Sequence, residues 1–196
     1  MKVHVIIDHP WENSFSYAIL SSLTEGLQRG GHSIDLLDLN LEGFNPVFSP
    51  QELALYAEGG SLDPKVKEYQ QRLMDADYLV MIFPIWWNVM PARLKGYMDK
   101  VLLPGFAFTK GQYPEPLLDH IRGATILTTS GAPDKVVHET YHSAIDWVLC
   151  KGTLEFCGIS PTFWHNFGET GFAPIEAHQA WLAFIHQCGL EINDIL

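Results

Sequence analysis

The chain is predicted to adopt an α/β fold, in which a parallel sheet carries helices on both faces. Apolar, β-branched runs alternate with segments whose apolar residues recur at helical spacing. Two runs, Val3–Asp8 and Tyr78–Ile85, are almost continuously apolar, as strands buried on both faces are. With 196 residues, of which 47% are hydrophobic, the chain is long enough for one full core. We therefore expect a single domain over residues 1–196.

Strands are expected in three further places. Ala124–Ser130 is another apolar and β-branched run, and His32–Leu39 and Ser160–Gly168 show the same pattern less continuously. Because helical segments lie between these runs, the alternation indicates βαβ units.

Helices are expected after the strands. The first ends at the Gly30–Gly31 pair, which is a good helix stop. Another begins at Pro91, because proline suits the first helical position. Each has its apolar residues on one face, as a helix packed on a sheet requires. The expected helices are Phe15–Leu27, Pro91–Leu102, His138–Phe156 and Pro174–Leu190.

Residues Glu42–Asp63 interrupt the alternation. This segment, EGFNPVFSPQELALYAEGGSLD, is longer than an ordinary crossover loop and carries aromatic residues, proline and glycine. We expect a surface excursion with a short helix, which is a candidate border for a site or a partner.

The charge balance restricts the partners. Twelve Lys and Arg residues stand against 23 Asp and Glu residues, which gives a formal net charge of −11 at pH 7. Such a field repels phosphate backbones and anionic membrane surfaces, so nucleic acid is not expected as a partner. No run reaches the roughly 18 apolar residues that a membrane span needs, and no membrane insertion is expected.

The cysteines Cys150, Cys157 and Cys188 form no CxxC pair and no metal-site spacing with histidine. We expect buried thiols and no bound metal. The amino-terminal stretch MKVHVIIDHP leads directly into a strand and lacks a signal-peptide pattern. We therefore expect a cytoplasmic protein.

In an open α/β sheet, ligands bind beyond the carboxyl ends of the strands, so the loops there form the candidate site. The first loop, DHPWENSFSYA, has neither the GxGxxG fingerprint of dinucleotide binding nor the GxxxxGK[ST] of a P-loop. It places Ser14 and Ser16 at a helix start, where N–H groups and hydroxyls hold phosphates, and His9 at the strand end. The alternative is that Asn13 or Ser14 only caps the helix.

The second loop, PIWWN, covers Pro84–Asn88 and carries two adjacent tryptophans. Successive side chains of an extended segment point to opposite sides, so Trp86 and Trp87 cannot both face the core. One of them is a candidate wall for a planar ligand. The alternative is that both pack beneath the following helix or at a subunit contact.

The third loop, TTSGAP, covers Thr128–Pro133 and combines hydroxyls with a glycine that permits close backbone approach to a ligand. Alone it also reads as a plain turn. Parallel strands bring all three loops to one edge of the sheet. Together they predict a ligand with a phosphate near Ser14–Ser16 and a flat ring near Trp86–Asn88 and Thr128–Gly131, which is the shape of a flavin nucleotide.

The segments HPWENSFSYA, FPIWWNVMPARLKGYMDKVLLPGFAF and TTSG resemble the flavodoxin-like NAD(P)H:quinone oxidoreductases. This family includes bacterial drug-activity modulators, general-stress proteins and ancillary subunits of potassium-efflux systems. The likeness extends over nearly the whole chain, and the order F-P-x-x-W, P, L-K-G and G-F-A-[FY] is its most specific part. The resemblance implies a flavodoxin-like, doubly wound sheet of five parallel strands and a homodimer with the flavin at the subunit interface.

The resemblance also implies which residues bind the cofactor. His9, Ser14, Phe15 and Ser16 match positions that hold the phosphates and the ribityl chain. Pro84, Ile85, Trp86, Trp87 and Asn88 match the loop that lines the isoalloxazine ring, with Trp87 at the family's tryptophan. Thr128, Thr129, Ser130 and Gly131 match the loop whose N–H groups meet the polar edge of the ring. Ser130 departs from the usual Gly-Gly pair.

Mammalian members of the family have a tyrosine and a histidine after the third loop that assist hydride transfer. The segment APDKVVHETYHSA is shorter here, and His138, Tyr141 and His142 do not align directly with that pair. Tyr141 and His138 are the catalytic candidates.

The function that the resemblance implies is two-electron hydride transfer from NAD(P)H, through a bound flavin, to quinones or similar acceptors. FAD is the expected cofactor, with FMN as the alternative, and NAD(P)H is the co-substrate. Two other functions stay open: a flavodoxin-type electron carrier, and a flavin-binding regulatory subunit of a potassium-efflux transporter.

Overall fold

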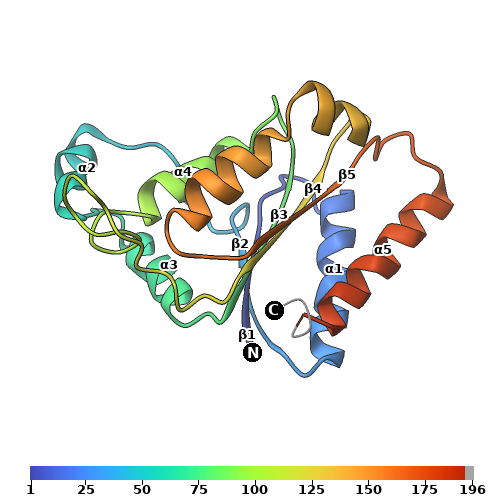
Figure 1. The fold of residues 1–196 in the computed structure, drawn as a ribbon, viewed down its shortest axis with the longest axis horizontal. Coiled ribbons are helices and arrows are strands. Elements are labelled where there is room, and N and C mark those ends of the chain that lie inside the picture. Colours follow the sequence, from blue (N-terminus) through green and yellow to red (C-terminus); the bar gives the residue numbers. More distant parts are fainter. Residues whose placement is uncertain (193–196) are drawn as a thin grey trace.

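The computed structural model describes residues 1–192, so the last four residues of the predicted domain lie outside the described part. Five strands form one sheet in the order β2-β1-β3-β4-β5, and every neighbouring pair is parallel (Figure 1). The predicted doubly wound α/β architecture is therefore confirmed. The strands are β1 (Lys2–Ile7), β2 (Ser33–Asp38), β3 (Tyr78–Pro84), β4 (Ala124–Thr129) and β5 (Thr162–Phe167).

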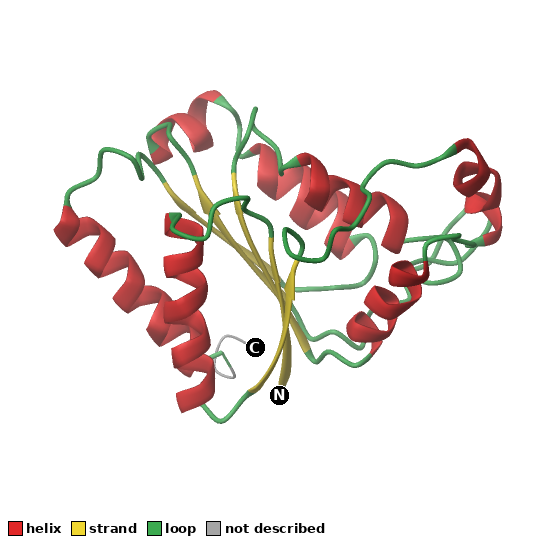
Figure 2. Ribbon diagram, turned by 180° about the vertical axis from the view of Figure 1, so that it is seen from behind, coloured by secondary structure: helices red, strands yellow, loops and turns green. Residues whose placement is uncertain are grey.

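Helices cover both faces of the sheet (Figure 2). One apolar cluster joins the sheet to α1 and α5, and a second joins it to α3, α4 and η3. Within residues 1–192, every helix is too short or too polar to cross a membrane. The helices are α1 (Phe15–Arg29), α2 (Pro50–Leu55), the 3-10 helix η1 (Tyr56–Glu58), α3 (Pro64–Met74), α4 (Ala92–Val101), the π-helical segments η2 (Val136–Thr140) and η3 (Asp146–Glu155), and α5 (Ile175–Leu190).

The burial of each strand accounts for its sequence pattern. All residues of β3 and β4 are buried, because both strands have helices on each face, and their sequences are correspondingly apolar. The edge strand β2 is mostly exposed or half-buried, which explains its weaker apolar pattern.

The expected continuous helix over His138–Phe156 is wrong. A turn separates η2 from η3, and in it His142 and Ser143 both have a φ of 53°, in the left-handed region that ends a helix. The hydroxyl of Ser143 lies 2.9 Å from Nδ1 of His138. The turn brings Ile145 into the core at the start of the second segment.

Helix α4 begins at Ala92, one residue later than predicted. Pro91 is its N-cap, with a ψ of 155° that is not helical. Pro91 has no side-chain acceptor for the first N–H groups of the helix. Asp8, at the end of β1, supplies it: its Oδ2 accepts a hydrogen bond of 2.9 Å from the backbone N–H of Leu94. A residue 86 positions away in the sequence thus caps the helix.

Segment 42–63 is, as predicted, an excursion with a short helix, α2. Lys100 of α4 attaches it to the domain. Only 2% of Lys100 is exposed, and its Nζ lies 2.7 Å from Oε1 of Glu52 and donates to the carbonyl of Asn45 at 3.0 Å. The buried ammonium is therefore both paired and hydrogen-bonded.

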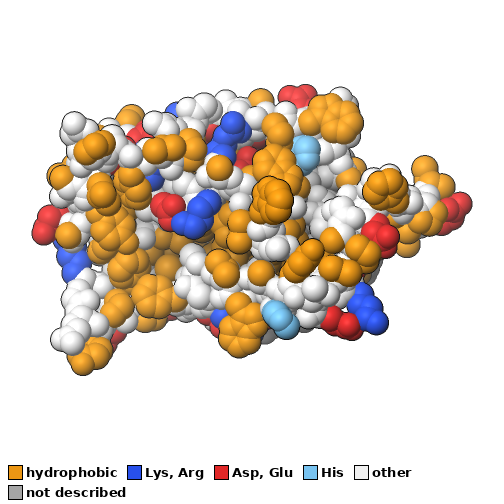
Figure 3. All heavy atoms as spheres, turned by 90° about the horizontal axis from the view of Figure 1, so that it is seen from above, with side chains coloured by type: hydrophobic (Ala, Val, Ile, Leu, Met, Phe, Trp, Pro, Cys, Tyr) orange, Lys and Arg blue, Asp and Glu red, His pale blue; other side chains and the backbone are white. Residues whose placement is uncertain are grey.

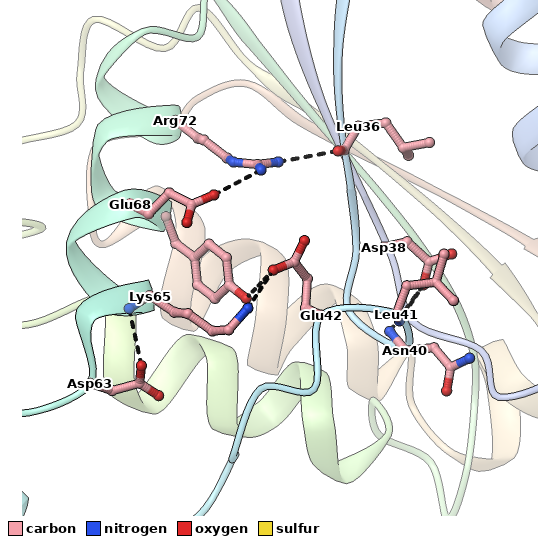
Figure 4. Close-up of polar contacts among 10 residues, drawn as sticks. Leu36, Asp38, Asn40, Leu41, Glu42, Asp63, Lys65, Glu68 and Arg72 are labelled. Atoms are coloured by element: carbon pink, nitrogen blue, oxygen red, sulfur yellow. Dashed lines mark hydrogen bonds and ion pairs between the residues drawn. The ribbon is translucent and has the colours of Figure 1, made fainter.

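Helix α3 is absent from the sequence-based expectations, although its start has a clear signal. The side chain of Asp63 accepts from the N–H of Lys65, and Pro64 occupies the first turn. Figure 4 shows the polar contacts that tie this helix to β2 and the loop after it. Lys65 Nζ donates to Glu42 at 2.8 Å, and Arg72 donates to the carbonyl of Leu36 and to Glu68.

Candidate functional site

The three candidate loops meet at the carboxyl edge of the sheet, as predicted. The strands that precede them, β1, β3 and β4, are consecutive neighbours in the sheet. The N–H of Ile85 donates to the carbonyl of Thr129 at 2.7 Å, which joins the second loop to the third. The hydroxyls of Ser16 and Thr129 lie 3.4 Å apart, which joins the first loop to the third. Hydrophobic side chains cover much of this side of the molecule (Figure 3).

In the first loop, Ser14 occupies the capping position of α1, but its side chain makes no capping hydrogen bond. Its Oγ is buried and has no hydrogen-bond partner among residues 1–192. The alternative that this hydroxyl only caps the helix is therefore contradicted. A buried hydroxyl without a partner costs about 1–3 kcal/mol, which a bound phosphate at the start of α1 would relieve.

His9 and Phe15 lie on either side of this serine. Nδ1 of His9 accepts from the N–H of Trp11 at 3.0 Å, and burial lowers the pKa of the imidazole, which favours its neutral form. The ring of Phe15 lies 4.7 Å from that of His178 and 5.9 Å from that of Trp181. Phe15 thus joins the first loop to the start of α5.

The second loop is a tight two-residue hairpin. Trp86 and Val89 exchange backbone hydrogen bonds of 3.0 and 3.2 Å, and the central residues Trp87 and Asn88 have φ values of 51° and 64°. Asparagine tolerates this left-handed conformation, but tryptophan is strained in it, at a cost of about 1–3 kcal/mol. Trp87 is 96% exposed and Trp86 46% exposed, so the alternative that both pack beneath the following helix is wrong.

The start of the second loop is buried. Pro84 is the last residue of β3 and lies in the core, and Ile85 packs against the apolar cluster beneath α4. These two residues hold the base of the hairpin, so the exposed tip starts from a fixed position.

The third loop is mostly engaged within the protein. Thr128 is fully buried, and its Oγ1 donates to Asn166 at 2.9 Å and accepts from Trp164 at 2.8 Å. The N–H of Ser130 donates to the carbonyl of Phe167 at 3.0 Å, so the expectation that this N–H group meets the flavin ring is wrong, although Ser130 itself lines a cavity described below. Gly131 is the open position: a Cβ built there meets no atom within 4 Å.

A cavity of about 460 Å³ lies between the second and third loops. It brings together five of the predicted cofactor residues and one of the two catalytic candidates, Tyr141. The cavity is lined by Ile85, Trp87, Asn88, Ser130, Gly131, Ala132, Val137 and Tyr141.

His138, the other catalytic candidate, is not among the residues that line this cavity. Its ring lies 4.7 Å from that of Trp164, and its Nε2 is 3.4 Å from Oδ1 of Asp134. With Ser143 on its other nitrogen, the imidazole is engaged on both sides.

A further cavity of about 330 Å³, which was not predicted from the sequence, lies beside the first loop. It is formed by Gly168, Glu169, Phe172, Ala173, Pro174, Ala177 and Trp181. Phe172 is exposed although it is a large aromatic residue, and Trp181 contacts Phe15 of the first loop. The signal was the aromatic residues that flank the start of the last helix.

The arrangement fits a flavin nucleotide. The unpartnered hydroxyl of Ser14 and the start of α1 suit its phosphate, and the open space at Gly131 allows a ring to approach the backbone. Within residues 1–192, no group of three or more His, Cys, Asp or Glu side chains is arranged to bind a metal ion.

Comparison with known proteins agrees with this geometry. Residues 1–185 match a family described as having a flavodoxin-like fold. A Haemophilus influenzae protein named an uncharacterized NAD(P)H oxidoreductase is 28% identical over 185 residues, which cover 93% of this chain and 91% of that protein. NAD(P)H dehydrogenase (quinone) 1 of Cavia porcellus is 29% identical over 189 residues, covering 85% of this chain and 69% of that protein.

The solved structure of an NAD(P)H:quinone oxidoreductase from Methanothermobacter marburgensis superposes with a TM-score of 0.88 at 27% identity, covering 98% of this chain and 97% of that one. Smu.1420 from Streptococcus mutans superposes with a TM-score of 0.86 at 30% identity, covering 97% of this chain and all of that one (100%). Because the family match spans nearly the whole chain, this protein belongs to the flavodoxin-like family whose relatives include the NAD(P)H:quinone oxidoreductases.

Proposed function

We propose that the protein is a flavin-dependent NAD(P)H oxidoreductase that reduces quinones or similar acceptors. The observation that carries the proposal is the cavity of about 460 Å³ at the carboxyl edge, with a strained, 96% exposed Trp87 in its wall. A strained and exposed aromatic residue disfavours folding, so its presence indicates a ligand that uses it. Relatives named as NAD(P)H:quinone oxidoreductases support the same activity.

When bound, a flavin would supply the two-electron hydride chemistry between NAD(P)H and the acceptor. The chain binds and orients it. Ser14 and the first N–H groups of α1 hold the phosphate, where the helix dipole favours negative charge. Trp87 and Ile85, which line the cavity, would exclude water from the ring, and the open backbone at Gly131 would let the polar edge of the ring approach.

Tyr141 is the residue that we assign to the substrate side. It lines the cavity of about 460 Å³ between the second and third loops, which we call the ring cavity. Because Tyr141 is partly exposed there, its hydroxyl is placed to donate a hydrogen bond to a bound ring or acceptor. We assign His138 an indirect role. Through its contacts with Asp134 and Ser143 it stabilises the turn that precedes η3 and so positions Tyr141.

We propose FAD as the cofactor. The cavity of about 330 Å³ beside the first loop offers Phe172 and Trp181 to an adenine ring, and Phe15 connects it to the phosphate position. FMN would not use this cavity. The mass of the flavin released from the purified protein decides between the two.

The proposal includes a homodimer. A further cavity lies between α4 and η3, and the exposed apolar side chains of Val148 and Phe156 are among its walls. Trp147, also in η3, is exposed as well. Exposed apolar groups gathered in this way are typical of subunit contacts. Light scattering during size-exclusion chromatography should give twice the chain mass of 22.1 kDa. Because NAD(P)H is its reductant, we place the protein in the cytoplasm.

Steady-state oxidation of NAD(P)H with menadione as acceptor tests the proposed function. A quinone reductase turns over repeatedly in this assay, whereas a flavodoxin-type electron carrier shows almost no turnover. A regulatory subunit of a potassium-efflux transporter would instead copurify with the transporter and control it when quinone reduction is abolished by mutation.

A further inference from the structure

A cavity of about 270 Å³ lies on the face of the sheet that α1 and α5 cover. The middle parts of three strands contribute to its walls, with Val80 of β3, Leu127 of β4 and His165 of β5. It shares no described lining residue with the ring cavity or with the cavity beside the first loop. A ligand bound there would therefore be separate from the one proposed at the carboxyl edge.

The close packing of α5 on α1 keeps this space open. A Cβ at Gly26 would clash with the backbone carbonyl of His186, and a Cβ at Gly189 would lie 2.7 Å from the carbonyl oxygen of Leu23. The two glycines thus allow the helix backbones to touch. Helix α5 makes its most extensive contacts with α1, beside which it lies in Figure 1, and not with the edge strand β5. Because these backbone contacts fix α5, the cavity cannot close by a shift of the helix toward β5.

The walls of this cavity carry no charge. Its lining residues within 1–192 include no Lys, Arg, Asp or Glu, in a chain with a net charge of −11. The hydroxyl of Thr125 is already hydrogen-bonded to that of Tyr78, at 2.8 Å. Burial raises the pKa of the Cys188 thiol and lowers the pKa of the His165 imidazole, which favours the neutral form of both. A charged ligand would lose its water here without gaining a partner, so the cavity favours an uncharged one.

His165 supplies a hydrogen-bonding group to these apolar walls. Its ring centroid lies 5.1 Å from that of Phe184, edge to face, and neither ring nitrogen is hydrogen-bonded to another residue of 1–192. A neutral imidazole has one donor and one acceptor nitrogen. The side chain is therefore able to bind one hydroxyl group of a ligand.

The size and the aromatic walls indicate the shape of the ligand. Phe163 of β5 and Phe184 of α5 are only partly buried although they are large apolar residues, so they lie on the side where the cavity opens. Their rings suit contact with another aromatic ring. An apolar cavity of about 150 Å³ holds benzene, so a cavity of about 270 Å³ has room for two fused rings.

We propose that this cavity binds a small, uncharged molecule of two fused aromatic rings with one hydroxyl group, whose rings contact Phe163 and Phe184 and whose hydroxyl bonds to His165. The inference is independent of the proposed function, because the described walls of this cavity contain none of the residues assigned to the flavin or to the acceptor.

Calorimetric titration of the flavin-loaded protein with 2-naphthol tests the proposal. Three matched probes accompany it: naphthalene lacks the hydroxyl, 2-naphthoate carries a negative charge, and 1-decanol has the same number of carbon atoms in a linear chain. We expect 2-naphthol to bind saturably and naphthalene to bind several-fold more weakly, because it lacks one hydrogen bond. The affinity of 2-naphthoate should be lower by about tenfold or more, and 1-decanol should also bind more weakly, because ordering its chain costs entropy.

Variants locate the bound probe. Cys188→Phe fills the cavity and should weaken the binding of 2-naphthol about tenfold or more. Ala183→Phe is the matched control, since it adds the same ring at an exposed position of α5 outside the cavity, and its affinity should stay within about twofold. His165→Leu should weaken the binding of 2-naphthol several-fold and leave that of naphthalene within about twofold.

Trp87→Ala, which alters the ring cavity, should leave the affinity for 2-naphthol unchanged. If Trp87→Ala weakens the binding while Cys188→Phe and His165→Leu do not, the probe occupies the ring cavity and the inference is overturned. Absence of saturable binding would overturn it too, and tighter binding of 1-decanol than of 2-naphthol would overturn the aromatic class of ligand.

A measurement on the unchanged protein decides if Cys188→Phe does not fold. Because Cys188 lines the cavity and is partly exposed, bound 2-naphthol should slow its alkylation by N-ethylmaleimide, as followed by mass spectrometry of the labelled peptide. An alkylation rate that 2-naphthol does not change would contradict the proposal. Turnover with menadione, measured in parallel on Ala183→Phe and His165→Leu, reports on the proposed function alone.

Discussion

The cluster around Lys100 and the hairpin around Trp87 each contain a residue in an energetically unfavourable environment. Only the cluster around Lys100 compensates for it with contacts inside the protein. Lys100 is a charge in the buried interior, and its described contacts compensate for the burial: the carboxylate of Glu52, that of Asp63 at 4.0 Å, the carbonyl of Asn45 and the ring of Phe44. Trp87 is a large aromatic residue left in water, in a backbone conformation that disfavours it.

The difference separates residues that stabilise the fold from residues that we propose bind a ligand. Around Lys100 the protein satisfies its own polar groups, and the result attaches segment 42–63 to α4. Around the candidate site, the described residues leave the hydroxyl of Ser14 without a hydrogen-bond partner and the space at Gly131 open. Substitutions in the first region should therefore change stability, and substitutions in the second should change ligand binding.

The largest effect is expected for Lys100→Met. It leaves the carboxylate of Glu52 buried without its partner, so the free energy of unfolding should fall by about 3–5 kcal/mol. Urea unfolding measures it. The double variant Lys100→Met, Glu52→Gln should recover a large part of the loss, because the uncompensated charge is gone. A loss below about 1 kcal/mol would show that Lys100 does not hold the excursion in place.

The same ion pair should make stability depend on pH. The hydrogen bond from Lys100 lowers the pKa of Glu52 in the folded state. Its contribution is therefore complete above the ordinary glutamate pKa of about 4.3 and is lost as the pH falls through the lower folded value. The difference in unfolding free energy between the unchanged protein and Glu52→Gln should shrink over that acidic range. A difference that stays constant with pH would contradict this assignment.

Substitutions in the hairpin should change flavin binding and leave stability almost unchanged. Trp87→Ala should weaken flavin binding about tenfold, the value of one aromatic contact, while the free energy of unfolding of the flavin-free protein changes by less than about 0.5 kcal/mol. Flavin fluorescence titration and urea unfolding measure the two quantities. Unchanged flavin content and turnover would remove Trp87 from the site.

Trp87→Gly tests separately whether the backbone at this position is strained, because glycine accepts the left-handed backbone conformation. We expect this variant to be more stable than Trp87→Ala by about 0.5–1 kcal/mol and equally poor in flavin binding. If both substitutions destabilised the protein strongly, the hairpin would belong to the structural region and the comparison would fail.

The smallest effect is expected for Gly131→Ala. A Cβ at this position meets no protein atom within 4 Å, so stability should change by less than about 0.5 kcal/mol. A flavin ring against the backbone would meet the new methyl group, and its affinity should fall a few-fold. Flavin titration of this variant, with Gly171→Ala as a control glycine that also has open space, checks it. Equal affinity in both variants would place the ring elsewhere.

The α/β architecture and the meeting of the three candidate loops at one edge were predictable from the sequence for a local reason. Continuous apolar runs identify buried parallel strands, and parallel strands bring their following loops to one edge whatever the details of packing. The family pattern around FPIWWN then predicted which of these loops would line a flavin ring. Helix α3 was missed, although the Asp63–Pro64 start is a recognisable signal.

Other features depend on contacts between residues far apart in the chain. Asp8 caps a helix 86 residues later, and Ser130 donates its N–H to β5, which neither local sequence reveals. The break between η2 and η3 comes from left-handed backbone at His142 and Ser143, which non-glycine residues adopt only when tertiary packing imposes it.

The sequence by itself determined that a parallel sheet would present three loops and a pair of tryptophans at one edge, because strand burial and loop position follow from hydrophobic pattern alone. The tertiary structure alone decided that Trp86 and Trp87 would line two different cavities and that Tyr141, not His138, would reach the ring cavity. The physical reason is that the direction of a side chain is set by backbone angles and by neighbours from distant segments, which the order of residues does not display.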